Sequence, residues 1–300
     1  MALRIVELYG FPAGDRSDQA THARGAGWCP FLRDTCTKRF RDSTVSGVCT
    51  VALSRDSRPV ICCPNRLYAG SYQVLRDVAE AAFGPSAHLV TRMSAGDDPS
   101  TAGRVVAFGK RWGKELRLPQ REGRGGFFVD WVLALLDGQG QLKEFVAAEV
   151  QSIDTTGTYR AQWAALMAGN TLATSSAAGL NWENVSKRIL PQLIYKGHVL
   201  RLERLCTKGL FFICPAPVYE RIQMRLGHGM MKYPAPAQGT LTFMWYDLEP
   251  QVAVQGPRRL QARGTFTTTI DQLAVAFTAP RDLPPAGVYE AALVAALAES

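Results

Sequence analysis

The sequence predicts an α/β or α+β protein built around a mixed central sheet flanked by helices. Short apolar runs of strand length alternate along the chain with segments that repeat apolar residues at helical spacing. Clusters rich in glycine and proline separate these segments, as turns do. The chain has 300 residues, 47% of them hydrophobic, which is enough for one large domain or for a large and a small one.

The first third of the chain contains three expected strands and one expected helix. The two later strands each carry a cysteine at or near one end, and a polar, glycine-rich loop follows the first strand. The helix stops at Gly84-Pro85, a pair that ends helices. The expected strands are residues 3–9, 47–53 and 59–68, and the expected helix is 74–83.

The middle of the chain predicts an antiparallel hairpin. Residues 127–132 and 145–151 have strand patterns, and the turn cluster Asp137-Gly138-Gln139-Gly140 lies between them. With the two-residue period of a strand, Glu149 and Gln151 share one face of an otherwise apolar segment. Two polar side chains therefore leave this strand on the same side.

The register of this hairpin decides whether its acids meet. If Leu136 pairs with Gln141, Asp130 lies opposite Ala147 and one diagonal step from Glu149. Diagonal neighbours lie ~7–8 Å apart at Cα, so the two carboxylates can reach one divalent ion. That arrangement is typical of metal-dependent phosphodiester cleavage. The alternative is a half-exposed hairpin whose acids are solvated.

The second half of the chain alternates expected helices and strands. Pro191 falls inside a helical stretch that opens near Asn181, and a kink or break is expected there because proline lacks a backbone donor. An amphipathic helix is expected at 288–298. The other expected helices are 159–168 and 218–226, and the expected strands are 209–214, 240–247 and 262–270.

Five of the seven cysteines lie in the first quarter of the chain. A disulfide framework is not expected in a cytosolic protein, so such a cluster favours a metal site. Four thiolates are available from Cys29, Cys36, Cys49 and one of the Cys62-Cys63 pair. The paired knuckles of ordinary zinc fingers are missing, and buried cysteines that bind no metal remain the alternative.

Two segments are candidates for contact with DNA. The net charge is +8, and a pI near 9.2 favours a polyanionic partner. Residues 104–125, with strands expected at 105–108 and 115–118, are rich in arginine and lysine that can neutralise phosphates, although a solvated basic face is the alternative. Residues 181–188 combine asparagine with basic side chains that suit base edges or a helix cap. The expected DNA contacts are Gln19, Arg121, Arg124, Asn181, Asn184, Lys187 and Arg188.

No apolar stretch is long enough to span a membrane, and the N-terminal residues lack the pattern of a secretory signal, so a bacterial cytoplasmic location is expected.

Several segments resemble those of the NotI-like type II restriction endonucleases, a family of the PD-(D/E)xK nuclease superfamily with a four-cysteine iron site. The resemblance extends from about residue 17 to residue 215, with gaps. The segments are Ser17-Asp18-Gln19-Ala20-Thr21, Cys29-Pro30-Phe31-Leu32, Gly47-Val48-Cys49, Cys63-Pro64-Asn65-Arg66, Glu115-Leu116, Asp130-Trp131, Glu149-Val150-Gln151 and Asn184-Val185-Ser186-Lys187-Arg188.

The resemblance implies a PD-(D/E)xK endonuclease domain at 73–300 after a small metal-binding region with four cysteine ligands at 1–72. It implies structural iron on four thiolates, and thiolate chemistry alone would also suit zinc. It further implies a catalytic set with Mg²⁺ on two acids. The implied iron ligands are Cys29, Cys36, Cys49 and Cys63, and the implied catalytic residues are Asp130, Glu149 and Gln151, with Glu115 as an additional acid.

Gln151 departs from most of the superfamily, which has lysine at this position. Glutamine donates hydrogen bonds but brings no positive charge to the transition state. The sequence leaves open whether a lysine such as Lys143 or Lys114 compensates.

These features predict a Mg²⁺-dependent, sequence-specific endonuclease that acts on double-stranded DNA. One chain holds one site, so a homodimer on a palindrome is expected for cutting both strands. The resemblance implies a GC-rich palindrome containing GGCC and a cognate DNA methyltransferase in the same host. The alternatives are a non-cleaving DNA-binding protein with a structural four-cysteine metal site, and a repair or junction nuclease of the same fold.

Overall fold

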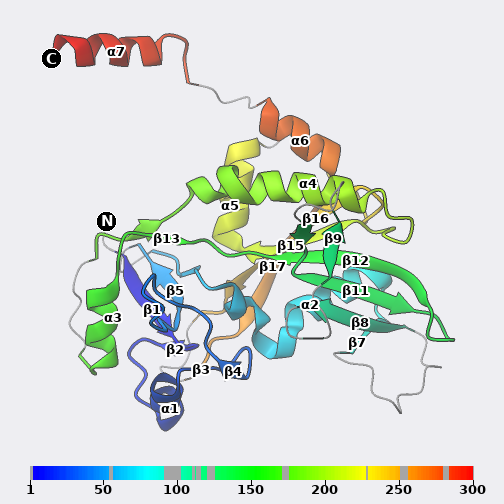
Figure 1. The fold of residues 1–300 in the computed structure, drawn as a ribbon, viewed down its shortest axis with the longest axis horizontal. Coiled ribbons are helices and arrows are strands. Elements are labelled where there is room, and N and C mark those ends of the chain that lie inside the picture. The colour runs from blue at the N-terminus through cyan, green and yellow to red at the C-terminus, as the bar shows by residue number, and fades with distance from the viewer. Residues whose placement is uncertain are drawn as a thin grey trace.

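A mixed sheet lies at the centre of the computed structural model (Figure 1), which confirms the predicted α/β class. The structure describes residues 3–53, 57–90, 103–109, 112, 116–119, 126–170, 176–227, 229–250, 256–279 and 284–299. Within these residues the sheet has seven strands in the order β17-β16-β15-β12-β11-β8-β7. The strands are β7 (His88–Val90), β8 (Arg104–Gly109), β11 (Trp131–Leu136), β12 (Leu142–Val150), β15 (Leu210–Pro215), β16 (Thr240–Leu248) and β17 (Leu260–Thr269).

The middle of this sheet is parallel and buried. β15 pairs in parallel with both β12 and β16, whereas β11 runs antiparallel to its neighbours β12 and β8. Every residue of β15 is buried, as are the last five residues of β12. Parallel strands covered on both faces require continuous apolar runs, which explains why Phe211 to Cys214 shows no polar alternation.

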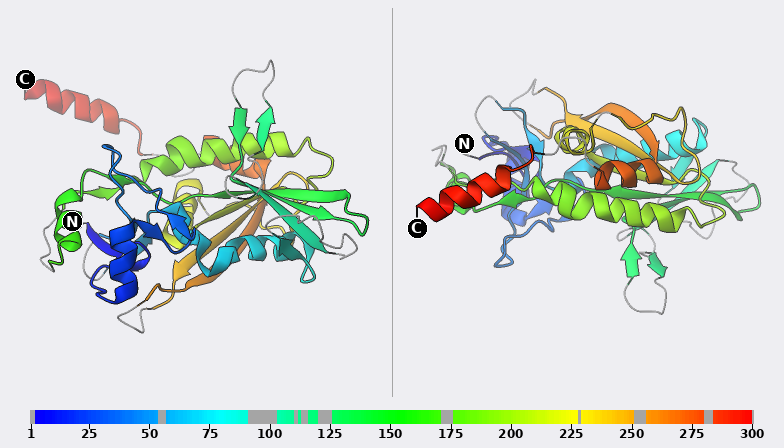
Figure 2. Two further views of the ribbon diagram at one scale, coloured as in Figure 1. Left: turned by 60° about the horizontal axis from the view of Figure 1, so that its bottom comes forward. Right: turned by 90° about the horizontal axis from the view of Figure 1, so that it is seen from above.

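Helices cover the two faces of the sheet. α4 (Leu190–Leu200) lies on one face and α2 (Ala69–Phe83) on the other (Figure 2). α5 (Ala216–Leu226) follows β15 directly, and α6 (Ile270–Thr278) follows β17 and packs against α4 and α5. Lys196 of α4 contacts Glu149 of β12, so α4 covers the end of the strand that leads into Gln151.

The N-terminal residues form a second, smaller sheet of four strands in the order β2-β1-β5-β6 within the described part of the chain. Helices α1 and α3 lie at its side (Figure 1). The elements of this region are β1 (Arg4–Leu8), β2 (Phe11–Pro12), α1 (Asp18–Ala26), β3 (Trp28–Cys29), β4 (Asp34–Thr35), β5 (Val48–Ala52), β6 (Val60–Ile61), the 3-10 helix η1 (Pro64–Tyr68) and, from later in the chain, α3 (Arg160–Met167).

A fully buried ion pair joins the small sheet to the rest of the molecule. The Nε of Arg66 lies 2.9 Å from Oε2 of Glu7, and neither side chain is exposed. Thr50 donates to the same carboxylate at 2.5 Å, and Nη2 of Arg66 also donates to the carbonyl of Arg258 at 2.6 Å. Arg66 therefore links β1 to the segment that leads into β17.

Several expected elements have different boundaries in the structure. The strand expected at 59–68 is β6 followed by η1, because Pro64 fits the first turn of a helix and cannot donate within a sheet. Pro191 does not end the helical stretch, which changes from the π-helical segment Val185–Ile189 to α4 just before it, so the interruption expected there is a change of helix type. The strand expected at 127–132 is interrupted at Asp130, between β10 (Gly126–Phe128) and β11.

The C-terminal helix α7 (Val288–Ala298) forms where the sequence predicts a helix, but its amphipathic packing is not observed. It extends away from the body of the molecule (Figure 1), and none of its residues is buried. None of the described helices is both long and apolar enough to cross a lipid bilayer.

The Arg66–Glu7 pair generates a stability prediction. Replacing Arg66 with methionine leaves a carboxylate buried without its cation, so the free energy of unfolding should fall by about 3–5 kcal/mol in urea denaturation. Arg201→Met is the matched control, because the pair of Arg201 with Asp271 is exposed, with side-chain exposures of 42% and 66%. Its cost should stay below about 1 kcal/mol. Equal losses in the two variants would contradict this role of the buried pair.

Candidate active site

Asp130 and Glu149 face each other across two adjoining strands. In the observed register Trp131 pairs with Ala148, so the next position places Asp130 directly opposite Glu149. The predicted pairing of Leu136 with Gln141 is wrong, because Leu136 pairs with Leu142. An irregularity between Leu135 and Leu136 moves the register by one more residue, so the difference at Asp130 is two residues. A shift of two keeps both acids on the predicted face and brings them closer than the expected diagonal.

The backbone holds Asp130 in this position. Its Oδ2 accepts a hydrogen bond from the amide of Val150 at 2.9 Å, which ties the start of β11 to the end of β12. Gly109 lies alongside, and a Cβ there would come within 2.5 Å of the Trp131 ring and 2.7 Å of the Asp130 carbonyl oxygen. Glycine therefore permits β8 to approach the acid from its other side.

Glu149 is buried and bound to a lysine from the helix above it. Its side chain is 3% exposed, which excludes the alternative of a solvated acid at this position. Nζ of Lys196, in α4, donates to Oε1 at 2.6 Å, and the Lys196 side chain is 7% exposed. Lys196 is not among the residues predicted from the sequence, because its spacing of 47 residues from Glu149 gives no local signal.

The electrostatics of the site reflect both burial and charge. Burial and the negative charge of Asp130 together raise the pKa of Glu149 to about 7, although Lys196 acts in the opposite direction. The same two carboxylates contribute to the pKa of Tyr68, which burial raises far above its ordinary value. Asp130 and Glu149 are thus close enough to interact, and Tyr68 lies near both.

The remaining predicted catalytic residues are only partly described. Gln151 is half-buried one residue beyond β12, where its backbone N–H donates to the carbonyl oxygen of Ile213 at 3.0 Å. Glu115 and Lys114 lie outside the described residues. Lys143 is exposed near the opposite end of β12, six residues or ~20 Å from Glu149, so it does not reach the site.

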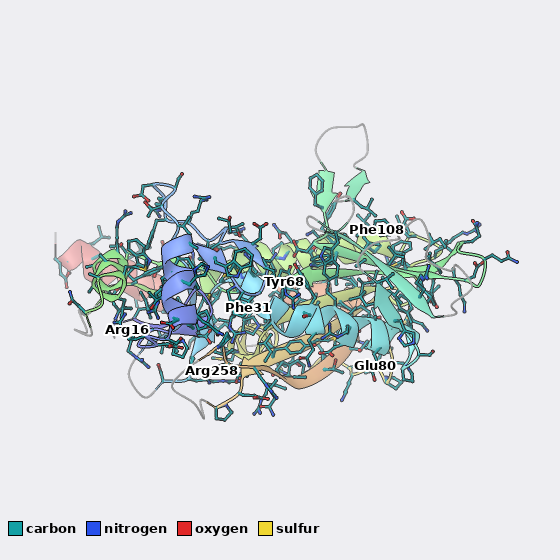
Figure 3. The ribbon with its side chains drawn as sticks, turned by 90° about the horizontal axis from the view of Figure 1, so that it is seen from below. Arg16, Phe31, Tyr68, Glu80, Phe108 and Arg258 are labelled. Atoms are coloured by element: carbon teal, nitrogen blue, oxygen red, sulfur yellow. The ribbon has the colours of Figure 1, made fainter. Side chains whose placement is uncertain are left out.

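Aromatic side chains pack around Trp131, the residue that directly follows Asp130. The indole Nε1 of Trp131 donates to the hydroxyl of Tyr68 at 3.0 Å, and Tyr72 and Trp112 pack around the same indole. Tyr68 lies beside Phe31 between the two sheets (Figure 3). Rigid aromatic packing fixes the indole that directly follows Asp130.

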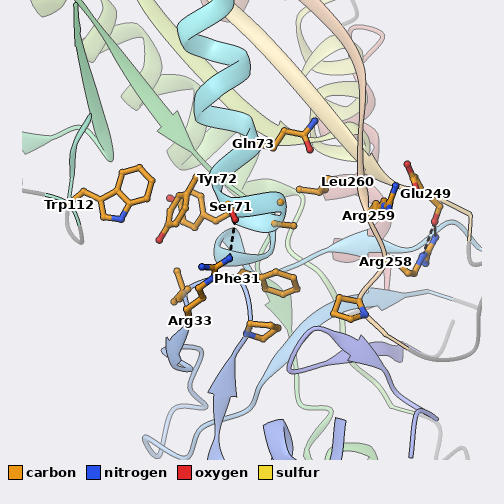
Figure 4. Close-up of a pocket in the computed structure, with 16 residues that line it drawn as sticks. Phe31, Arg33, Ser71, Tyr72, Gln73, Trp112, Glu249, Arg258, Arg259 and Leu260 are labelled. Atoms are coloured by element: carbon orange, nitrogen blue, oxygen red, sulfur yellow. Dashed lines mark hydrogen bonds between the residues drawn. The ribbon is translucent and has the colours of Figure 1, made fainter. Parts of the chain in front are cut away.

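A cavity of about 890 Å³ opens beside this cluster (Figure 4). It is lined by aromatic rings and by the basic residues Arg33, Arg258 and Arg259. Gly70, Ser71 and Tyr72 form part of its wall with φ values of 66°, 55° and 62°. Left-handed backbone in non-glycine residues costs roughly 1–2 kcal/mol each, and Arg33 donates to Ser71 Oγ at 3.2 Å within this wall.

A basic groove lies where the N-terminal region meets the loop after β12. Its volume is about 870 Å³, and it gathers three of the predicted DNA contacts, Asn181, Asn184 and Arg188. Asn184 donates to Asp154 at 2.9 Å, and Arg188 donates to the same carboxylate at 3.4 Å. The further basic residues that line it are Lys38, Arg39, Arg41 and Arg160, three of which come from one short run that the sequence analysis did not single out.

The other predicted DNA contacts are not in this groove. Lys187 lines a neighbouring cavity and pairs with Glu183 at 2.5 Å. Gln19 is exposed on α1 and does not line this groove. Arg121 and Arg124 lie outside the described residues.

The cysteines of the N-terminal region are close to one another but are not assembled as a metal site. All seven cysteines are buried, described, and outside disulfide bonds. Burial raises the pKa of Cys49, and the neighbouring Cys63 and Cys29 raise it further; Cys36 contributes in the same way at Cys63. Among the described residues, however, no group of three or more His, Cys, Asp or Glu side chains is placed to hold a metal ion.

Comparison with known proteins identifies a family for most of the chain. A family model described as restriction endonuclease NotI matches residues 16–253, more than three quarters of the sequence. The matched range runs from α1 to β16 and includes Asp130, Glu149 and the clustered cysteines, whereas β1, β2 and β17 lie outside it. A search of curated proteins finds no match.

The geometry predicts an unusual titration of Glu149 in metal-free protein. Carbon-detected NMR of ¹³C-labelled glutamate should report a pKa of about 7 for this carboxyl group, and Asp130→Asn should lower it by removing a neighbouring negative charge. Because a pKa of about 7 exceeds the ordinary value of 4.5, protonation of Glu149 stabilises the folded state. This contribution to the free energy of unfolding is lost as pH rises through about 7. Asp137→Asn, in the hairpin turn, is the control. An unchanged Glu149 titration in Asp130→Asn would refute the proximity of the acids.

Proposed function

The chain belongs to the restriction endonuclease NotI family, and from this premise we propose that it is a type II enzyme that hydrolyses DNA phosphodiesters with Mg²⁺. The observation that carries the proposal is the pair Asp130 and Glu149, which meet where β11 begins and β12 ends, in the interior of a mixed sheet covered by α4. This is the arrangement expected of a PD-(D/E)xK core.

The donor chemistry of the pair fits Mg²⁺. Carboxylate oxygens are the hard ligands that this ion prefers, and two opposed carboxylates that repel each other gain from a shared cation. When bound, the ion supplies Lewis-acid polarisation of the phosphate and lowers the pKa of a coordinated water. Asp130 and Glu149 would hold it, each kept in position by a hydrogen bond from the protein.

We assign Gln151 to the orientation of the attacking water. It lies two residues after Glu149 and thus on the same side of the strand, and its amide both donates and accepts hydrogen bonds. Glu115 is proposed as an additional acid of the site, on the resemblance of Glu115-Leu116 to the family.

The basic groove is the proposed path of the DNA backbone beside this site. Lys38, Arg39 and Arg160 bring positive charge to a cavity that also holds Asn181 and Asn184, side chains able to contact base edges. We propose that Lys187, Arg188, Gln19, Arg121 and Arg124 add further contacts. The proposed target is a GC-rich palindrome containing GGCC, cut by a homodimer and protected by a cognate methyltransferase.

The cysteines are proposed to hold a structural metal, iron or zinc, in the region 1–72, ahead of an endonuclease domain at 73–300. The four thiols are buried in one region, where neighbouring cysteines raise the pKa values of Cys49 and Cys63, and thiolates bind both metals. Binding would have to draw them into a ligand set, because the described residues do not form one without the ion. Burial raises the pKa of Cys63 to about 12, and a bound cation would offset the cost of losing that proton. The ligands would be Cys29, Cys36, Cys49 and Cys63.

Digestion of genomic DNA followed by sequencing of the ends separates the proposal from its alternatives. A restriction enzyme gives one palindromic sequence at every end. A repair or junction nuclease would give ends without a shared sequence, and a non-cleaving DNA-binding protein would shift DNA on a gel and leave it intact.

Substitution of either acid tests the catalytic pair. Asp130→Asn and Glu149→Gln should each reduce the cleavage rate on the order of 10³-fold, as the loss of several kcal/mol of transition-state stabilisation implies. Their affinity for DNA in Ca²⁺ should change little. Asp137→Asn, in an exposed turn, is the control and should cut normally. Normal cutting by either active-site variant would refute its assignment.

The adjacent cysteines Cys62 and Cys63 give a matched test of the metal site. Both thiols are buried, but only Cys63 is a proposed ligand. Elemental analysis of purified protein should find one metal per chain in Cys62→Ser and a marked loss in Cys63→Ser and Cys36→Ser. A red colour would indicate ferric iron, and a colourless metal-bound protein would indicate zinc. Full metal content in Cys63→Ser would rule out the proposed ligand set.

A further inference from the structure

Lys196 is a buried lysine whose ammonium group meets the candidate active site. Its Nζ lies 2.6 Å from Oε1 of Glu149, and the side chains are 7% and 3% exposed. In the described part of the chain, this carboxylate is the one acceptor within hydrogen-bond distance of Nζ. An ammonium group has three N–H donors, so two remain for other groups near Glu149.

Packing alone does not require a lysine here. Leu193, Gly197 and Leu200 are buried beside it on α4, and an apolar side chain would continue that surface. Taking an ion pair out of water costs desolvation energy that the attraction often fails to recover, and well-packed apolar replacements are commonly neutral or stabilising. The fold therefore gives no strong reason for a charged pair at this depth.

The position of Lys196 is fixed by close helix packing. A Cβ on Gly197 would lie 2.1 Å from Cδ1 of Ile270. The close approach of α4 to the start of α6 therefore requires glycine at position 197. The helix can neither rise from the sheet nor rotate without losing this contact. Lys196 is thus held on a rigid element, as a precisely placed group must be.

The site would otherwise have an excess of negative charge. Asp130 and Glu149 are both acids, Gln151 is neutral, and a phosphodiester adds a further negative charge that grows in the transition state. Lys143 lies at the opposite end of β12 and does not reach these groups. Lys196 is the lysine that the described structure places against them.

We propose that Lys196 is a positioning residue of the nuclease site, which fixes one oxygen of Glu149 and supplies the positive charge that Gln151 does not. The inference rests on the proposed nuclease function of Asp130 and Glu149. In this proposal the positive charge comes from α4, which covers the sheet, and not from β12, the strand that carries Glu149.

A matched pair of variants separates charge from hydrogen bonding. Lys196→Gln keeps a long side chain that can donate to Glu149 but removes the charge, whereas Lys196→Arg keeps the charge. Single-turnover cleavage, measured per molecule of DNA-bound enzyme so that unfolded protein is not counted, should fall on the order of 10²–10³-fold in Lys196→Gln. It should stay within about tenfold of the starting enzyme in Lys196→Arg.

Two further measurements exclude a purely structural role. The Kd for DNA in Ca²⁺ should differ by less than about threefold between Lys196→Gln and the unsubstituted protein, because the charge acts on the reaction. Adding Gln151→Lys to Lys196→Gln should recover at least about tenfold of the lost rate, since it returns a cation to the site. Lys143→Gln, on the exposed end of the same strand, is the control for loss of a lysine and should cut at the normal rate.

The outcomes distinguish this proposal from the function on which it rests. If the unsubstituted protein does not cut DNA at all, the nuclease assignment fails. If it cuts, and Lys196→Gln cuts at the same rate per bound molecule, or Lys196→Arg loses as much activity as Lys196→Gln, the charge of Lys196 has no such role and the proposal is overturned.

Discussion

Two carboxylates, those of Asp130 and Glu149, lie next to each other on the interior strands β11 and β12, and the surrounding structure must offset the free energy that this placement costs. Burial of Glu149 and the negative charge of Asp130 together raise the pKa of Glu149 to about 7. The fold offsets this cost with a backbone amide on Asp130 and the ammonium group of Lys196 on Glu149. Buried charged groups that destabilise the fold are typical of functional sites, because apolar residues at the same positions would stabilise it more.

The two sheets contribute different parts of one surface. The central sheet brings the acids together, whereas the small N-terminal sheet brings the basic run around Lys38 to the loop that follows β12. The Arg66–Glu7 pair joins η1 to β1 of the small sheet, and the Trp131–Tyr68 hydrogen bond joins η1 to β11 of the central sheet. A metal in the cysteine cluster would stiffen the N-terminal side and so fix the basic groove relative to the acids.

Sequence patterns were sufficient where the signal is local. The apolar run of β15, the turn after Leu136 and the face shared by Glu149 and Gln151 follow from strand periodicity. The predicted register is wrong by two residues at Asp130. One residue comes from the pairing of Leu136 with Leu142 and one from the irregularity after Leu135, and neither has a sequence signature. Lys196 and the groove arose only from tertiary packing, which no pattern within one segment records. The family match agrees with the nuclease interpretation of the sequence.

Crystals of the protein with DNA and Mn²⁺ test the central claim most directly, because the anomalous signal of manganese locates the ion without prior assumptions. The account predicts a peak between the carboxylates of Asp130 and Glu149, about 2.1–2.2 Å from an oxygen of each and next to a phosphate of the DNA. A peak bound by other residues, or bound DNA with no manganese at this pair, would contradict it.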